Sequence, residues 1–314
     1  MDQFEIQFVN FAKLVILALV PYVLASQGTM LGGRTGIFNV SQEGVMLAAA
    51  SAGFLGAYLS NNLAMGILAA IFMGGLFGLA LAYFTTTLKM NQFVIGLALF
   101  FIGLALSTLL FKLVVGVTLQ PPLIPTLRNM AIPGLAQIPI IGEIFFNQNL
   151  LVYFTILLSL FLYYLLYQTS FGLELRAVGE NPKAADSLGV NVAFMRYMTT
   201  TIGGMFMGLA GAYLPMVYTG TFTEGMVSGR GWLSIALTFF GGWRPHLIFF
   251  GSLFFAGVEV LSLRMQILRA GIPHQFLLMV PYIATILVMM RAFKGVRAPA
   301  FLGQNYDRES RTQV

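Results

Sequence analysis

Long apolar runs recur along this chain, and several approach the roughly 20 residues with which a helix crosses a bilayer. Residues 92–116 form one such run and contain a single charged residue, Lys112. Hydrophobic residues make up 58% of the chain and charged residues only 9%, whereas soluble domains have about 45–50% and about 25%. The strands of a membrane β-barrel would instead alternate apolar and polar residues. The sequence therefore predicts an all-α polytopic membrane protein with a single transmembrane domain over residues 1–314.

The apolar runs predict about nine transmembrane helices, with eight or ten as alternatives. The expected spans cover residues 9–31, 37–59, 63–85, 92–116, 150–168, 195–218, 231–243, 246–263 and 274–292. Residues 117–149 are rich in proline, which breaks helices, so we expect an extramembrane loop with a short surface helix. The seventh span is short, and it fits a broken or re-entrant helix. Glycines four residues apart, Gly74/Gly78 and Gly204/Gly208, predict helices that approach one another closely.

Lysine and arginine residues indicate the orientation, because they collect in cytoplasmic loops. The proline-rich stretch contains only Arg128, whereas the middle and the end of the chain are basic, with Arg176, Lys183, Arg196, Arg291, Lys294, Arg297, Arg308 and Arg311. We therefore expect residues 170–194 and 294–314 to be cytoplasmic, the proline-rich loop to be extracytoplasmic, and the N-terminus to lie outside for nine spans. Arg264 and Arg269 then fall on the outer side, against the rule, which keeps eight or ten spans open.

Residues 172–191, GLELRAVGENPKAADSLGVN, concentrate charge in an otherwise apolar chain. Asn181 is a favoured N-cap residue, Pro182 suits a first helical turn and Gly189 can end a helix. The segment therefore predicts a helix end, a turn and a second short amphipathic helix on the cytoplasmic face. A capped helix in this place suits the docking of a partner, and a solvated loop at the membrane surface is the alternative.

Two short segments share a pattern. Residues 32–44, GGRTGIFNVSQEG, and residues 228–242, SGRGWLSIALTFFGG, both place Gly-Arg and a further glycine before a helix of small residues. Transporters are often built from repeated halves whose broken helices meet at the substrate path. The pattern indicates a weak internal repeat, and chance matches between glycine-rich segments are the alternative.

Four segments together resemble one family. Residues 176–191, followed by FMRYMTTTIGGMFMGLAGAYL, are similar to the cytoplasmic signature of ABC importer permeases that serve branched-chain amino acids, ribose-type sugars and nucleosides. GRTGIFNVSQEGVML (33–47) and GRGWLSIALTFFGGWRP (229–245) resemble the early segment of that branch and the segment before its last spans. RAPAFLGQNYDRE (297–309) resembles the tail of the nucleoside and simple-sugar permeases, which favours that group.

The resemblance implies the transmembrane-domain architecture of an ABC importer in the bacterial cytoplasmic membrane, without a catalytic site or a cofactor. It further implies ATP-binding cassette ATPase subunits, a second permease subunit that is either identical or different, and an extracytoplasmic substrate-binding lipoprotein as partners. The chain has no G-x-x-x-x-G-K-[ST] phosphate loop of its own. The charged middle would then be the coupling helix. Its expected ATPase-coupling residues are Arg176, Gly179, Glu180, Asn181, Pro182, Ala185, Asp186 and Gly189.

Polar residues near span ends are candidates for the substrate pathway, because such groups at membrane depth usually face a cavity or a partner. The expected pathway residues are Asn39, Glu43, Asn91, Gln92 and Phe93. Asn39 and Glu43, four residues apart, would share one helical face. For Glu43, and for Glu259 on the eighth span, helix capping or inter-helix hydrogen bonding is the favoured alternative. His246 and His274 lack convergent partner ligands, so no metal site is expected.

Two other classes of membrane protein compete with the importer permease. A secondary transporter or channel for a small polar solute would need acids in mid-span or a repeated filter motif. A membrane-embedded enzyme would need a converging catalytic set, and this chain contains two histidines and eleven acids. A nucleoside or purine is the first expectation for the substrate and a ribose-type sugar the second.

Overall fold

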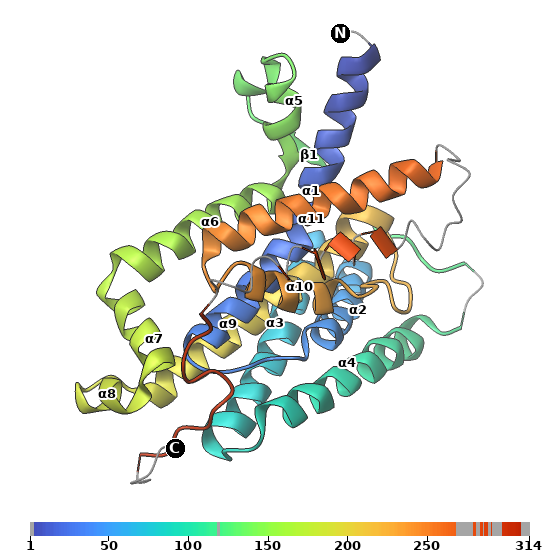
Figure 1. Ribbon diagram of the computed structural model, residues 1–314. Coiled ribbons are helices and arrows are strands. Elements are labelled where there is room, and N and C mark those ends of the chain that lie inside the picture. The colour runs from blue at the N-terminus through green and yellow to red at the C-terminus, as the bar shows by residue number, and fades with distance from the viewer. Residues whose placement is uncertain are drawn as a thin grey trace.

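The computed structural model describes residues 3–117, 120–267, 297–308 and, within the segment 279–290, residues 279–280, 283–284, 286–287 and 290. The chain is mainly helical, as its apolar runs predict (Figure 1). The long helices are α1 (Gln3–Arg34), α2 (Gln42–Ser60), α3 (Leu63–Ala82), α4 (Gln92–Val115), α6 (Leu150–Gln168), α9 (Val192–Tyr213) and α11 (Pro245–Ile267). The π-helices η1 (Tyr83–Thr87) and η3 (Leu214–Thr219) extend α3 and α9. The shorter helices are α5 (Ile141–Phe145), α7 (Ser170–Glu180), α8 (Pro182–Ser187), α10 (Arg230–Phe240) and the 3-10 turn η2 (Leu135–Gln137).

Seven helices in the described part of the chain are long and apolar enough to cross a membrane. They correspond to the expected spans other than the seventh and the ninth, so the count of about nine is not confirmed. The seventh appears as α10, whose 11 residues reach only about 16 Å, roughly half of a bilayer core. The ninth, residues 274–292, lies largely outside the described residues.

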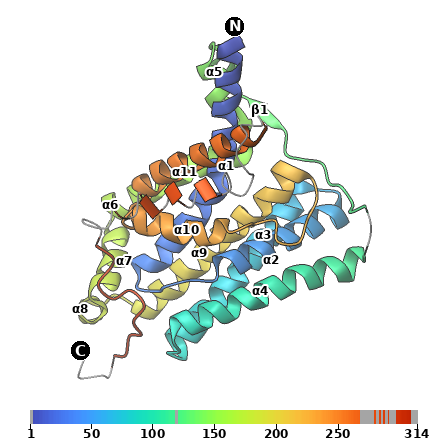
Figure 2. The ribbon, with the colours of Figure 1, turned by 45° about the vertical axis from the view of Figure 1, so that its right-hand side comes forward.

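Helix α9 lies at the centre of the bundle and packs against α1, α2 and α3 (Figures 1 and 2). A Cβ atom added at Gly74 of α3 would meet the carbonyl oxygen of Gly204, and one at Gly208 would meet that of Ala70. The backbones of α3 and α9 therefore touch where both sequences present glycine. This confirms the close helix approach predicted from the glycine pairs.

The two ends of the bundle are built differently. At one end, the N-terminal turns of α1 lie beside the proline-rich loop, in which β1 (Asn129–Ala131) pairs antiparallel with β2 (Asn147–Asn149) (Figure 1). An ion pair between Lys13 and Glu143 joins this loop to α1. At the opposite end lie α7, α8 and residues 297–308 of the tail (Figure 2). The segments expected on opposite sides of the membrane thus occupy opposite ends of the molecule.

Helix α2 begins deep inside the bundle rather than at its end. The backbone of Gly44, in its first turn, touches the backbone of Phe100 and Gly103 near the middle of α4. Residues 35–41, which connect α1 to α2, therefore run through the interior as non-helical chain. Irregular backbone at this depth is tolerated only when it is buried in protein or lines a cavity.

Candidate functional site

The charged middle of the chain folds as its sequence predicts. Helix α7 ends at Glu180, and the side chain of Asn181 accepts a hydrogen bond from the Ala184 backbone N–H at 3.0 Å, which caps α8. Pro182 occupies the first turn of α8. Gly189 has a φ of +90°, a conformation that glycine adopts at no steric cost, and it turns the chain towards α9.

One face of α7 and α8 packs against the bundle. Leu175, Val178 and Ala185 are buried, and a Cβ atom at Gly179 would meet the carbonyl oxygen of Arg34 at the end of α1. Only glycine allows α7 to approach α1 this closely. The backbone of α7 is therefore in direct contact with the end of α1.

The other face of this segment is exposed and carries both charged and apolar side chains. Glu180, Asn181 and Lys183 are exposed, and the side chain of Leu188 is 86% exposed at the tip of the segment. Arg176 turns back to the bundle, where its guanidinium lies 5.0 Å from the ring centre of Tyr167. This face therefore presents one apolar side chain at the tip beside charged ones.

The C-terminal tail forms a strap across this end of the bundle. The Phe301 backbone N–H donates to the Gly179 carbonyl oxygen at 2.9 Å, and the Gly303 N–H donates to that of Gly36 at 3.0 Å. The Ala300 N–H donates to the Glu180 carboxylate at 3.3 Å. The strap thus joins α7 to the connection between α1 and α2.

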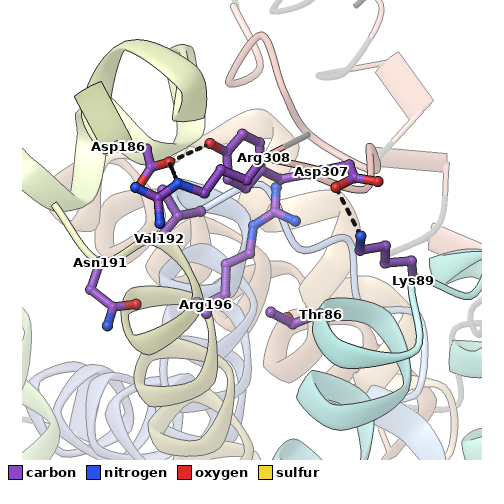
Figure 3. Close-up of a pocket in the computed structure, with 10 residues that line it drawn as sticks. Thr86, Lys89, Asp186, Asn191, Val192, Arg196, Asp307 and Arg308 are labelled. Atoms are coloured by element: carbon purple, nitrogen blue, oxygen red, sulfur yellow. Dashed lines mark hydrogen bonds and ion pairs between the residues drawn. The ribbon is translucent and has the colours of Figure 1, made fainter. Parts of the chain in front are cut away.

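Figure 3 shows the side chains with which the strap meets α8 and the connection between η1 and α4. The Asp186 carboxylate accepts from the Tyr306 hydroxyl at 2.9 Å and pairs with Arg308 at 3.0 Å. On the other side, Asp307 pairs with Lys89 at 3.0 Å. Burial, together with the hydrogen bond to Asp186, raises the pKa of Tyr306 above its ordinary value. These residues line an open cavity of about 460 Å³.

Arg196 of α9 lies under the strap, and its position was not expected from the sequence. Its side chain is 1% exposed, and it donates to the carbonyl oxygens of Thr35 and Gln304 at 3.1 Å. The guanidinium also lies 5.6 Å from the ring centre of Phe301. An arginine at the start of an apolar span is visible in the sequence and could have marked Arg196 as a functional residue. The sequence position alone does not indicate which residues it contacts.

Three of the expected pathway residues lie at the same end of the molecule as α7 and α8. Asn91 caps α4 by accepting from the backbone N–H groups of Phe93 and Val94. Gln92 is buried, accepts from the Phe38 N–H at 2.6 Å and donates to the Gln304 carbonyl oxygen at 3.2 Å. The Phe93 side chain is 51% exposed. These contacts connect α4 to the strap.

The other two expected pathway residues lie inside the bundle. The Glu43 carboxylate accepts from the Gly229 and Gly231 backbone N–H groups at 2.7 and 2.8 Å, so it caps the N-terminus of α10 from another helix. The two segments that share a sequence pattern therefore meet at Glu43. The expectation that Asn39 and Glu43 share one helical face is wrong, because Asn39 lies before the start of α2. The Asn39 side chain accepts from the Ser41 N–H and hydroxyl, and α2 begins only at Gln42.

A second polar cluster lies beside α10. Arg230 pairs with Glu259 of α11 at 2.7 Å, and the Tyr22 hydroxyl of α1 donates to the same carboxylate at 3.0 Å. For Glu43 and Glu259 alike, these contacts are the inter-helix hydrogen bonds named as the alternative to substrate contact. No group of three or more His, Asp or Glu residues in the described chain could hold a metal ion, and His274 lies outside the described residues.

Comparisons with known proteins agree on one family. Residues 10–289 match the model of the family described as "Branched-chain amino acid transport system / permease component". The guanosine ABC transporter permease protein NupQ of Bacillus subtilis is 33% identical, covering 93% of this chain and 94% of that protein. The nucleoside ABC transporter permease protein NupC of Lactococcus lactis is 32% identical, covering 95% and 98%. A protein named as a candidate glucose ABC transporter permease, TsgC13 of Haloferax volcanii, is 32% identical, covering 94% and 96%.

Proposed function

Because the chain belongs to the family of branched-chain amino acid transport system permease components, we propose that it forms the membrane pathway for a nucleoside in an ATP-driven importer. It is a multi-pass, non-catalytic permease subunit, and a separate subunit hydrolyses ATP. The observation that carries the substrate class is the similarity to NupQ and NupC over nearly the whole of all three chains. A ribose-type sugar is the second candidate, since TsgC13, named for glucose, is about as similar.

We further propose that α7 and α8 form the coupling element on which the ATPase docks. Three features support this role: the exposed Leu188 at the tip, the charged face around Lys183 and Glu180, and the backbone contact of Gly179 with the end of α1. Arg176, Asn181, Pro182, Ala185, Asp186 and Gly189 shape and support this element. Closure of the ATPase would press on α8 and, through Gly179, on α1.

The proposed orientation has the coupling segment, residues 170–194, and the tail, residues 294–314, in the cytoplasm, with residues 117–149 outside. The location of these segments at opposite ends of the bundle supports it (Figure 2). Nine spans, the last of them over residues 274–292, would then place the N-terminus outside. The membrane is the cytoplasmic, or inner, membrane of a bacterium.

Within this orientation, Asn39 and Glu43 lie beside the pathway at mid-membrane, where they hold the starts of α2 and α10. Asn91, Gln92 and Phe93 lie at its cytoplasmic end. The complete importer would contain this chain, a second permease subunit, two ATPase subunits and an extracytoplasmic binding lipoprotein. Either an identical or a different second permease is compatible with this arrangement.

Purification of the tagged protein from native membranes, with mass spectrometry of the co-purifying chains, tests this proposal. We expect an ATPase subunit, a permease subunit and a binding lipoprotein, and we expect the lipoprotein to bind guanosine more tightly than ribose. Isolation of the chain alone, in a detergent that preserves a control ABC importer, would contradict the proposal. It would instead favour a secondary transporter.

A further inference from the structure

A cavity of about 570 Å³ lies between α1, η3, α10 and α11, and its lining includes none of Asn39, Glu43, Asn91, Gln92 and Phe93. Its volume is within the range of roughly 300–1,000 Å³ that is typical of small-molecule sites. Most of its lining is apolar, with residues such as Leu14, Ala18 and Val260. The polar lining comes from Tyr218, Arg230, Glu259, Arg264 and Gln266. An apolar cavity with a few converging polar groups is the usual form of a ligand site.

The charged pair of this cavity is partly shielded but not closed off. The side chains of Arg230 and Glu259 are 20% and 18% exposed, and their nearest nitrogen and oxygen atoms are 2.7 Å apart. The second carboxylate oxygen accepts from Tyr22, and the Arg230 Nη1 atom donates to the Val227 carbonyl oxygen at 3.2 Å. A guanidinium has five N–H donors and a carboxylate about four acceptor positions. Both groups therefore retain hydrogen-bonding capacity for a ligand.

Gln266 supplies an independent indication that the cavity has a ligand. Its side-chain nitrogen Nε2 is buried and has no hydrogen-bond partner among the described residues, although the residue lines the cavity. A buried donor that makes no hydrogen bond destabilises the protein. A ligand oxygen in the cavity would remove this destabilisation.

The cavity lies at membrane depth. Tyr22, which contacts Glu259, is roughly 18 Å along α1 from Arg34, and α1 continues for roughly 28 Å beyond it to Gln3, at 1.5 Å per residue. Arg230 is the first residue of α10, and Tyr218 belongs to the π-helix η3. Broken helices and π-helical turns at such depth often mark functional sites. An ionisable pair inside a membrane protein likewise marks a substrate path more often than a purely structural contact.

Resting on the function proposed above, we propose that this cavity is a substrate site and that Arg230, Glu259 and Gln266 bind the vicinal hydroxyl groups of a neutral solute. The charges of Arg230 and Glu259 cancel each other, and Arg264, the third charged residue of the lining, contacts the Gln7 carbonyl oxygen and the Phe11 ring. A carboxylate accepts two neighbouring hydroxyl groups, one on each oxygen, while the guanidinium and the amide donate to them. The ring of Tyr218, 39% exposed at the cavity, offers a face for a planar base. A nucleoside with an intact ribose diol combines both features.

The test uses the complete importer reconstituted in proteoliposomes, with guanosine and 2′,3′-dideoxyguanosine as probes. The double variant Arg230→Met/Glu259→Met removes the pair without leaving one charge unpaired, a change that buried pairs often tolerate. Glu259→Gln is the conservative second variant. Glu224→Gln is the matched control, because Glu224 makes an exposed ion pair with Lys112 elsewhere. For each permease variant, KM is measured for both probes and their ratio is taken. The binding protein is the same in every measurement, so its own preference for one probe does not contribute to differences between variants.

We expect the preference for guanosine to fall by about tenfold in the double variant, as the loss of hydrogen bonds to charged groups predicts. The control should keep the wild-type preference. An unchanged preference in a double variant that still imports guanosine would overturn this site while leaving the proposed function intact. Failure of the wild-type importer to take up either guanosine or ribose would overturn the proposed substrate class, and this site's ligand with it.

Discussion

The polar groups of the molecule fall into two regions that differ in burial and in the kind of partner they contact. At the proposed cytoplasmic end, α8 is joined to the strap by ion pairs with exposed members, such as Asp186 with Arg308, whose side chain is 80% exposed. In the interior, Glu43 is 7% exposed and accepts hydrogen bonds from backbone N–H groups. The ion pairs between α8 and the strap thus join side chains of which one is exposed, whereas Glu43 contacts fixed backbone.

This difference indicates which region can rearrange during a transport cycle. Exposed ion pairs contribute at most about 1 kcal/mol, so α8 and the strap can lose these pairs at little cost. A hydrogen bond from a buried backbone N–H to a carboxylate contributes about 1.5–3 kcal/mol. We therefore expect the interior contacts to fix the fold and those at the end to change when the ATPase moves.

The largest effect is expected for Glu43→Ala. The Gly229 and Gly231 N–H groups lose their acceptor, and each unsatisfied buried donor costs about 1–3 kcal/mol. The variant should show a markedly lower unfolding temperature in detergent, measured by the loss of monodisperse protein on size-exclusion chromatography. The control is Glu224→Ala, which removes an exposed carboxylate of the proline-rich end and should leave that temperature within about a degree. Equal stability of the two variants would remove the distinction between the regions.

Local sequence signals predicted the local structure of the proposed coupling segment well. Asn181, Pro182 and Gly189 each act on the few residues beside them, so their roles as cap, first turn and terminator could be deduced without the rest of the fold. The short seventh span was also visible in the sequence. Its glycines, including Gly241 and Gly242, end the apolar run after about one half of a bilayer.

Contacts between distant segments could not be predicted. The bond from Gly229 to Glu43 joins residues 186 positions apart, and that from Tyr306 to Asp186 joins residues 120 positions apart. A single sequence carries no signal for such pairs. The start of α2 was misjudged for a different reason. Asn39 and Ser41 bond to each other and to nearby backbone, which competes with helix formation and delays the helix to Gln42.

A large effect on transport, rather than on stability, is expected for Gly179→Leu. The added side chain would enter the space of the Arg34 carbonyl oxygen and push α7 away from α1. Uptake by the reconstituted importer should fall at least about tenfold, while ATP hydrolysis continues, because the ATPase still docks but no longer moves α1. Gly257→Leu is the matched control, since a Cβ atom at Gly257 meets nothing within 4 Å. Loss of ATP hydrolysis and uptake in parallel would indicate failed assembly rather than uncoupling.

The smallest effect is expected for Asp186→Arg, which reverses one partner of an exposed pair. The substitution places a second guanidinium against that of Arg308 and removes the acceptor of the Tyr306 hydroxyl, so the strap should detach from α8. Because Arg308 is exposed and Asp186 only partly buried, solvent screens the pair, and we expect only a two- to fivefold drop in the number of substrates imported per ATP hydrolysed, an effect of about 1 kcal/mol or less. The double variant Asp186→Arg/Arg308→Asp restores the opposite charges and should recover most of the loss.

Tyr306→Phe separates the hydroxyl contribution from the charge contribution. Recovery in the double variant would show that the strap acts through this pair, whereas an equal defect in the single and double variants would mean that Asp186 contacts the ATPase directly.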